Sequence, residues 1–258
     1  MSFNVRTISS RTRAGSPDFW PSRRTAVTEV LALEQPTILG VQELLQEQLP
    51  AIESGLPASY RMLGEGREGG AKGELGAIFY DSSRLTAIDS DSYWLSDTPD
   101  VVASTTWGNR TTRMVTWARL RDRRTGSEFV VANTHLDHES ESARRKSAHA
   151  IADHVRGLDA DVPVIVMGDF NVSVESEPYS ILTHEGGLRD AWLCAHRRAT
   201  PAVGTFPNYD EPVPGGDRID WILANEHVEV LESAINPFRW NGRYPSDHTP
   251  VQALLRVA

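Results

Sequence analysis

Several short apolar runs in this sequence end at, or lie next to, an acid, an amide or a histidine. Strand ends at one edge of an open sheet line the usual ligand crevice of α/β proteins, so such residues are expected to meet in one pocket. A chain with this pattern must bring together strand ends that lie far apart in the sequence. The polar residues at these positions are Asn4, Glu43, His135, Asp169, Asn171, Asp220, Asp247 and His248.

Helical and strand patterns alternate along the chain. Residues 22–34 place apolar side chains at helical spacing, and Pro36 ends that helix. Residues 113–120 and 128–135 are predicted to be strands of a hairpin whose loop contains Thr125-Gly126. Hairpins combined with helices between other strands predict an α/β fold with mixed or antiparallel sheets. Further strands are expected at 37–41, 76–80, 162–167, 218–223, 228–235 and 251–257, further helices near 44–52 and 140–155, and a mobile glycine-rich loop at 61–73.

Composition places the chain among globular proteins rather than disordered ones, with 40% hydrophobic and 24% charged residues. Its composition changes nowhere as it would at a linker, so we expect a single domain over residues 1–258. Cys194 is the only cysteine, which excludes an intrachain disulfide and fits a reducing compartment. With no visible signal peptide or membrane-spanning stretch, the expected location is the cytoplasm.

The chain carries 26 lysines and arginines against 35 aspartates and glutamates, which gives a net charge of −9. This balance argues against a broad surface that coats nucleic acid, because most of the surface would repel a long duplex. A small basic pocket within an acidic protein remains compatible with the same charge.

The carboxylates and amides at the strand ends suit a hard divalent cation. Mg²⁺ takes oxygen ligands, commonly one or two carboxylates, with water and phosphate oxygens completing the shell. Glu43 and Asp247 are the candidate ligands, with Asn4 nearby. The sequence lacks the Cys/His spacing that is typical of zinc sites.

The remaining polar residues suit phosphoester hydrolysis, which needs an activated water and donors for the developing charge. Asp169 is a candidate to orient or deprotonate the water. Asn171 lies two residues further on, so on an extended segment it faces the same side and can donate to phosphate. A buried carboxylate can set the tautomer and charge of a histidine, and the candidate pairs are Asp220 with His248 and Glu74 with His135.

Each of these residues also has an ordinary structural explanation. A strand-end acid is usually solvated or caps a turn, and residues 169–171 could form a simple Asx turn. A single histidine is more often packed or exposed than catalytic. The functional interpretation depends on all of these residues occurring in one chain, in order, at the ends of apolar strands.

The motifs formed by these residues are S-F-N at 2–4, V-Q-E at 41–43, N-T-H-L-D-H at 133–138, G-D-F-N at 168–171, R-I-D-W at 218–221 and S-D-H at 246–248. This ordered set resembles the endonuclease/exonuclease/phosphatase superfamily, which includes pancreatic-type deoxyribonuclease, abasic-site endonucleases, inositol polyphosphate 5-phosphatases and neutral sphingomyelinases. Finer features resemble a bacterial subgroup of unassigned metal-dependent hydrolases.

The resemblance implies a four-layer α/β/β/α sandwich of two mixed, largely antiparallel sheets. It also implies a Mg²⁺ or Mn²⁺ cofactor. Arg6 departs from the family pattern, because several nuclease relatives carry a metal-holding acid there; its presence favours one metal or a weaker second site. The site that the resemblance implies consists of the metal ligands Glu43, Asp247 and Asn4, the catalytic residues His135, Asp169, Asn171, Asp220, His248 and Glu74, and the phosphate-binding residues Arg113 and Asn171.

The sequence therefore predicts a metal-dependent phosphoester hydrolase in which an activated water attacks phosphorus in line. The expected substrate is a small phosphorylated molecule or a phosphodiester, and no membrane or protein partner is predicted. Segments 107–113, 205–209 and 238–244 carry aromatic residues and arginines that would rim the pocket or simply pack their loops. A nuclease for single-stranded or short nucleic acid is one alternative, and a non-catalytic binding module on the same fold is another.

Overall fold

Two β-sheets packed face to face form the centre of the computed structural model, which describes residues 1–257. Among these residues the first sheet has seven strands, in the order β10 (Arg197–Arg198), β12 (Val228–Ile235), β13 (Val251–Val257), β1 (Ser2–Asn4), β2 (Ile38–Leu44), β4 (Leu75–Asp81) and β3 (Tyr60–Leu63). The second has six, in the order β5 (Leu85–Trp94), β6 (Met114–Asp122), β7 (Glu128–His135), β8 (Val164–Asp169), β11 (Asp220–Ala224) and β9 (Arg189–Asp190).

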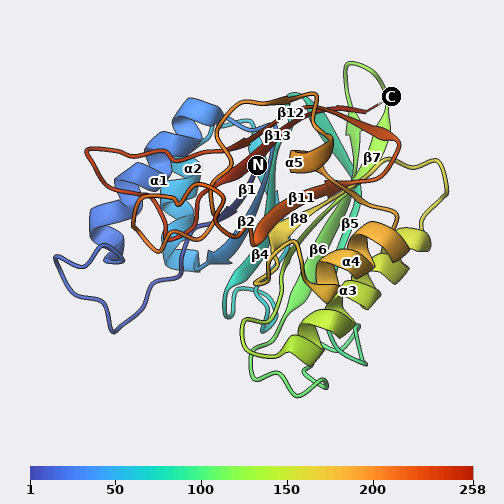
Figure 1. Cartoon of the computed structure of the whole chain (residues 1–258), viewed down its shortest axis with the longest axis horizontal. Coiled ribbons are helices and arrows are strands. Elements are labelled where there is room, and N and C mark those ends of the chain that lie inside the picture. The colour runs from blue at the N-terminus through green and yellow to red at the C-terminus, as the bar shows by residue number, and fades with distance from the viewer. Residues whose placement is uncertain (258) are drawn as a thin grey trace.

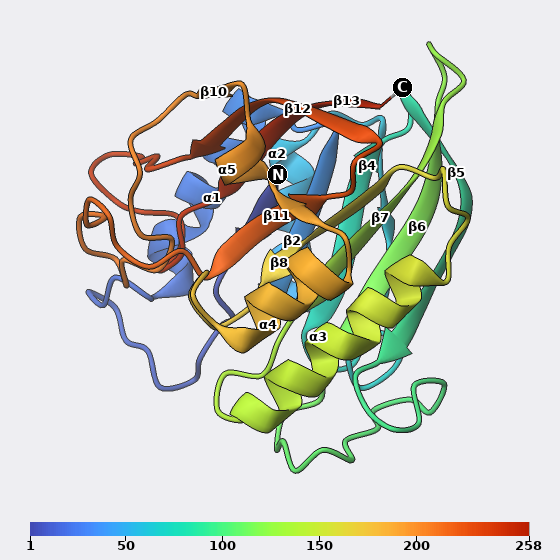
Figure 2. The ribbon, with the colours of Figure 1, turned by 45° about the vertical axis from the view of Figure 1, so that its right-hand side comes forward.

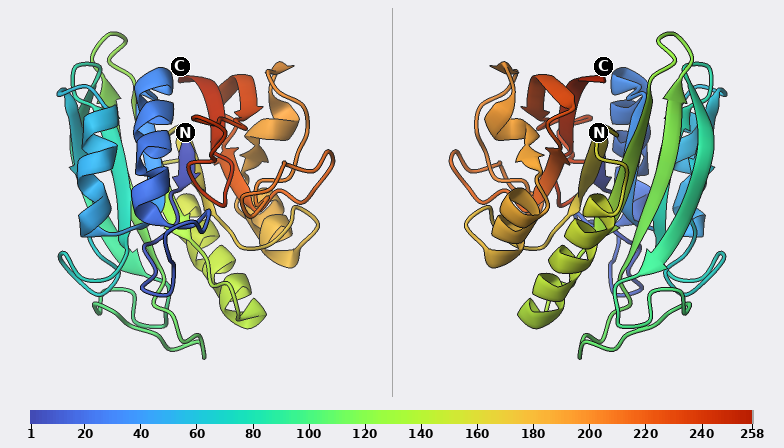
Figure 3. Two further views of the ribbon diagram at one scale, coloured as in Figure 1. Left: turned by 90° about the vertical axis from the view of Figure 1, so that its left-hand side faces the viewer. Right: turned by 90° about the vertical axis from the view of Figure 1, so that its right-hand side faces the viewer.

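Both sheets are mixed. The pairs β1–β2, β7–β8 and β10–β12 are parallel, and the other pairings are antiparallel. The prediction of mixed, largely antiparallel sheets is confirmed. The first strand lies between the last strand and β2, so the dark blue start of the chain runs beside its red end (Figure 3).

Helices cover the outer face of each sheet. The helices α1 (Trp20–Glu34) and α2 (Leu49–Gly55) pack on the first sheet, and α3 (Glu141–Arg156) and α4 (Glu177–Ser180) on the second (Figures 1 and 2). The predicted four-layer order of helices, sheet, sheet and helices is therefore confirmed. The remaining short elements are the 3₁₀ turn η1 (Gln46–Gln48), the π-helical turn η2 (Ile181–Glu185) and α5 (Ala191–Cys194). Among the described helices, none is long and apolar enough to cross a bilayer.

Three apolar cores separate the four layers, and the strand period of two assigns side chains to them. On β7, Phe129 and Val131 face the opposite sheet, whereas Val130 and Ala132 face the helices α3 and α4. On the other side of the molecule, Leu39 and the rest of the β2 outer face pack against α1 and α2. Strands that are buried on both faces hold the polar residues at their ends in fixed positions.

The local structure differs from the expectations at two places. Strand β5 was not predicted, because about half of its ten residues are polar and it lies at a sheet edge, where no apolar alternation is needed. The segment expected to be a loop, 61–73, begins with the end of β3, and a β-bridge joins Gly66 to Leu75. The rest of the segment forms turns and bends, as expected of a loop, with hydrogen bonds such as that from the Gly69 N–H to the Gly66 carbonyl at 2.7 Å.

Candidate functional site

Strand register brings the polar strand ends of both sheets to one side of the molecule. In the second sheet, His135 pairs with Asp169, which in turn pairs with Asp220. In the first sheet, Asn4 pairs with Gln42, so Glu43 follows directly. Strand β1 contacts β8 across the interface between the sheets, and the two groups of polar residues therefore meet.

Asp169 lies at the centre of this cluster and is 1% exposed. Its Oδ2 accepts a hydrogen bond from Asn4 Nδ2 at 2.9 Å and lies 3.4 Å from His135 Nε2 and 3.7 Å from His248 Nε2. Burial raises the pKa of Asp169 to about 7, although the charge of His248 opposes the shift. A carboxylate with this pKa is suited to take a proton from water near neutral pH.

His248 is paired with Asp220, as the sequence predicted. Its Nδ1 lies 3.0 Å and 3.2 Å from the two carboxylate oxygens of Asp220, and both side chains are buried. Burial alone would lower the pKa of His248, but the neighbouring carboxylates of Asp220 and Asp169 outweigh it and raise the pKa to about 10. The imidazole is therefore a cation at neutral pH, with Nε2–H directed toward Asp169.

Glu43 occupies a β-bulge near the end of β2, where its backbone has a φ of 59°. Such left-handed backbone is costly for a residue with a Cβ and is found most often at functional sites. Its carboxylate accepts hydrogen bonds from Asn4 Nδ2 at 3.1 Å and from the Thr7 N–H at 2.9 Å. Burial would raise the pKa of Glu43, but the Thr7 N–H, Arg6 and Asn4 together hold it below its ordinary value. Glu43 is therefore ionised and available to a cation.

Arg6 lies among the carboxylates that were predicted to bind metal. Its Nη1 is 3.6 Å from Glu43 Oε2, and its Nε is 3.5 Å from both Asp247 Oδ2 and Asp18 Oδ1. This buried Nε makes no hydrogen bond to any described residue. The Arg6 guanidinium therefore places one positive charge beside two of the candidate metal ligands, Glu43 and Asp247.

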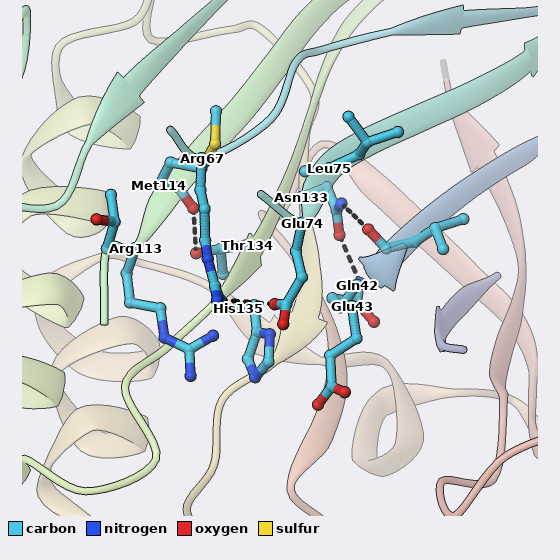
Figure 4. Close-up of a pocket in the computed structure, with 13 residues that line it drawn as sticks. Gln42, Glu43, Arg67, Glu74, Leu75, Arg113, Met114, Asn133, Thr134 and His135 are labelled. Atoms are coloured by element: carbon cyan, nitrogen blue, oxygen red, sulfur yellow. Dashed lines mark hydrogen bonds and ion pairs between the residues drawn. The ribbon is translucent and has the colours of Figure 1, made fainter. Parts of the chain in front are cut away.

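The predicted pairing of Glu74 with His135 is not what the structure contains. Glu74 Oε2 accepts a hydrogen bond from Arg67 Nη1 at 2.6 Å (Figure 4). His135 Nε2 instead lies 3.4 Å from Asp169 Oδ2. Both residues line the same recess, so the prediction placed them in the correct region with the wrong partner. Burial and nearby Arg113 lower the pKa of His135 well below its ordinary value, which keeps its imidazole neutral.

Asn171 and Arg113 also reach the cluster. The Asn171 N–H donates to Asp169 Oδ1 at 2.9 Å, and Asn171 Nδ2 donates to the carbonyl of Leu136 at 3.0 Å, which leaves one amide proton for a ligand. Arg113 is 4% exposed, and its Nη2 lies 3.1 Å from His138 Nδ1.

A cavity of about 320 Å³ opens onto these groups. Phe206, whose ring centroid is 4.7 Å from that of His248, is half-exposed at the cavity wall. Of the three segments expected to rim the pocket, 107–113 contributes Thr111 and Arg113, and 205–209 contributes Phe206. Segment 238–244 contributes no lining residue; its Tyr244 instead contacts Arg239 and Glu211. The cavity is lined by Arg6, Thr7, Glu43, Arg67, Glu74, Thr111, Arg113, His135, His138, Asp169, Asn171, Phe206, Asp247 and His248.

Sequence reasoning missed Arg67 and Thr7. Arg67 belongs to the segment expected to be mobile, and its contacts with Glu74 and Trp94 come from the folded structure alone. Thr7 acts through its backbone N–H, which no side-chain motif can reveal.

Two groups of residues offer positions for a metal ion. Asp169, Asp220 and His248 have donor atoms within 4.8 Å of one another. However, these three side chains are buried and already engaged, Asp220 with His248 and Asp169 with Asn4. Glu43 and Asp247 line the cavity and present carboxylate oxygens, which makes them the better candidates.

Comparison with known proteins gives a consistent match. The profile of the Endonuclease/Exonuclease/phosphatase family matches residues 1–248. The crystal structure of an endonuclease/exonuclease/phosphatase from Bacteroides vulgatus is 32% identical with a TM-score of 0.90, covering 100% of this chain and 97% of that one. A mannosyl-6-phosphatase from Bacteroides thetaiotaomicron is 30% identical with a TM-score of 0.90, covering 99% of this chain and 98% of that one.

A curated relative is more distant. Protein angel of Drosophila melanogaster is 27% identical over 188 residues, which are 68% of this chain. The chain spans about half of the length of that relative, with 50% of it covered.

Proposed function

Because this chain belongs to the Endonuclease/Exonuclease/phosphatase family, whose members act as phosphoesterases or nucleases, we propose that it is a Mg²⁺- or Mn²⁺-dependent phosphoester hydrolase. The observation that carries the proposal is the contact of Asp169 with both Asn4 and His248 beside Glu43 in one cavity. These groups come from distant parts of the chain and supply a base, a cation and a carboxylate ligand to the same space.

The candidate metal ligands fit a hard divalent ion. Glu43 and Asp247 offer carboxylate oxygens, and Arg6 shows that a positive charge is stabilised between them. Asn4 donates through Nδ2 to Glu43 and Asp169, and its Oδ1 accepts a hydrogen bond from the Arg6 N–H at 2.9 Å. Both ends of its amide are therefore engaged, and its proposed role is to orient the carboxylates instead of binding the ion. When bound, the ion would polarise the phosphoryl oxygens as a Lewis acid.

The chain's own residues supply the base and the charge stabilisation. Asp169 accepts a proton from the attacking water, the bond between phosphorus and the leaving oxygen breaks, and that oxygen takes a proton from solvent. Asn171 donates its free amide proton to a phosphoryl oxygen, and the His248 cation, held by Asp220, stabilises the charge that develops in the transition state. Arg113 contributes a further positive charge to the phosphate.

A small phosphorylated molecule is the proposed substrate. The mannosyl-6-phosphatase at 30% identity supports a phosphorylated sugar or a similar molecule. A cavity of about 320 Å³ has the size of a small-molecule pocket, and half-exposed Phe206 offers a flat apolar wall to the organic part of the substrate. With a net charge of −9, long nucleic acid would meet repulsion outside the cavity.

The proposal is tested with p-nitrophenyl phosphate, bis-p-nitrophenyl phosphate, sugar phosphates and short oligonucleotides, each with Mg²⁺, Mn²⁺ or EDTA. Asp169→Asn should retain the fold and lower kcat about 10²–10⁴-fold, because it removes the base. The matched control is Asp159→Asn, at an exposed aspartate outside the cavity. Wild-type protein that is folded but inactive with every metal would favour the non-catalytic binding module. Preferred cleavage of oligonucleotides, falling steeply with added salt, would favour the nuclease.

Metal binding is tested separately at Glu43. Glu43→Gln removes one ligand charge, so its Mn²⁺ affinity measured by calorimetry should fall, and excess Mn²⁺ should restore part of the rate. Glu47→Gln is the control, since Glu47 lies outside the cavity. Equal Mn²⁺ affinity in Glu43→Gln and wild type would remove Glu43 from the ligand set.

A further inference from the structure

Arg67 projects into the cavity from a backbone that is held on two sides. Its N–H donates to the Glu74 carbonyl at 2.9 Å, and its own carbonyl accepts a hydrogen bond from Trp94 Nε1 at 2.7 Å. Its guanidinium donates to the Glu74 carboxylate. Backbone and side chain are both restrained, so the guanidinium occupies a defined position at the cavity wall.

Arg113 reaches the same wall from the start of β6. Its guanidinium is buried, with Nη2 near His138 and Nε 3.9 Å from Asp137 Oδ2. The Nε atom is buried and has no hydrogen-bond partner in the described part of the chain. A buried guanidinium with unused donors is costly unless an anion supplies the missing acceptors.

The two guanidinium groups converge. Figure 4 shows the heads of Arg67 and Arg113 pointing toward the imidazole of His135. Burial and both cations lower the pKa of that imidazole, and after burial the charge of Arg67 also lowers the pKa of the Arg113 guanidinium. Arg67 is paired with Glu74, whereas Arg113 has a buried donor without a partner in the described part of the chain, so the recess offers an anion donors from two guanidinium groups.

The terminal phosphate of a monoester fits this arrangement better than a diester does. It has three non-bridging oxygens and about −1.5 to −2 charges near pH 7. A diester has a single charge and a second organic group that needs its own exit. Arg67 and Arg113 both line the cavity, so an ester group in place of one non-bridging oxygen would leave one of their donors without an acceptor.

We propose, building on the hydrolase function proposed above, that Arg67 and Arg113 together hold the terminal phosphate of a phosphomonoester. Arg67 is then the residue that gives the site its preference for monoesters over diesters. Glu74 keeps the Arg67 guanidinium at the cavity wall when no phosphate is bound.

The test compares wild type with Arg67→Gln and Arg67→Lys on p-nitrophenyl phosphate and bis-p-nitrophenyl phosphate. Removal of one charged contact should lower kcat/KM for the monoester about 10–100-fold. The diester value should fall by a smaller factor, so the ratio of the two changes by at least about tenfold. Arg67→Lys keeps the charge and should recover part of the monoester rate. The control is Arg119→Gln, an arginine on β6 whose ion pairs lie outside the cavity.

Binding of inorganic phosphate, followed by calorimetry with and without Mn²⁺, separates this proposal from the hydrolase function. Weaker phosphate binding in Arg67→Gln than in Arg119→Gln supports the anion site even if neither ester is cleaved. If wild type cleaves esters but both variants keep its monoester-to-diester ratio and its phosphate affinity, Arg67 is only a structural partner of Glu74. A wild type that prefers the diester also overturns the proposal.

Discussion

At the scale of single residues, the carboxylate that lies beside each histidine of the cavity sets the role of that histidine. Asp220 was assigned to His248 and lies 3.0 Å from its Nδ1. Glu74 was assigned to His135 but bonds Arg67. The sequence indicates that a catalytic histidine has a carboxylate partner. Because several carboxylates reach this cavity, the register of the strands decides which carboxylate lies beside which histidine.

The Asp220–His248 pair predicts non-additive kinetics. Because Asp220 acts through His248, Asp220→Asn and His248→Gln should each lower kcat about 10²–10⁴-fold, and the double variant should be little worse than either. The measurement is a double-mutant cycle on phosphoester hydrolysis, with circular dichroism to check folding. Losses that multiply in full would show that the two residues act independently.

At the scale of elements, the β6–β7 hairpin is stabilised by an ion pair at its loop. Asp122 accepts hydrogen bonds from Arg84 Nε at 2.9 Å and from the Arg124 N–H at 2.8 Å. Arg84 chiefly lowers the pKa of Asp122 to about 2. Since the folded state lowers this pKa, the stabilisation is complete above the unfolded value near 4 and is lost as the pH falls through about 2.

Asp122→Asn should therefore lower the free energy of unfolding at pH 7 by about 1 kcal/mol, as expected for a partly solvated charged contact. The difference from wild type should shrink as the pH falls from 4 toward 2. Urea unfolding at pH 7, 4 and 3 measures this difference in the free energy of unfolding. Asp100→Asn, at an exposed loop position, is the control. A difference that is constant with pH would mean that the lost contact does not depend on ionisation.

At the scale of the whole molecule, the site depends on how closely the two sheets approach. A Cβ on Gly40 would lie 2.7 Å from Met167 Cε of the opposite sheet. Asn133 of the second sheet donates to the carbonyls of Val41 and Ala77 in the first sheet, both at 3.0 Å. With β1 paired to β13 as well, we infer that residues 1–257 fold as one unit.

Asn133→Ala should lower the free energy of unfolding by about 2–4 kcal/mol, because buried partners lose their hydrogen bonds. It should also lower kcat, because Glu43 and Asp169 lie on different sheets and Asn133 holds the two sheets in alignment. Asn225→Ala is the matched control, because the Asn225 side chain bonds the backbone of Val164 and Val162 at one end of β8, away from the contact between the sheets. If both variants lose stability and neither loses activity, alignment of the sheets by Asn133 does not limit the reaction.

The sequence by itself determined the α/β class, the positions of the strands that are buried on both faces, and the identity of most cavity residues. Apolar periodicity and turn residues are local signals, and the buried strand 128–135 and the partly buried strands 228–235 and 251–257 carry them strongly enough to be predicted with their observed bounds. The motifs identified the family because the full set occurs in order along one chain, whereas any single motif is unspecific.

Only the tertiary structure decided which side chains touch. The bulge that turns Glu43, the insertion of Arg6 between carboxylates and the place of Arg67 beside Glu74 depend on contacts between segments distant in the chain. The polar edge strand β5 was not predicted for the same reason. It is stabilised by hydrogen bonds to its partner β6, and its own sequence has no apolar alternation. Such contacts are set by the packing of four layers, which no local spacing of residues encodes.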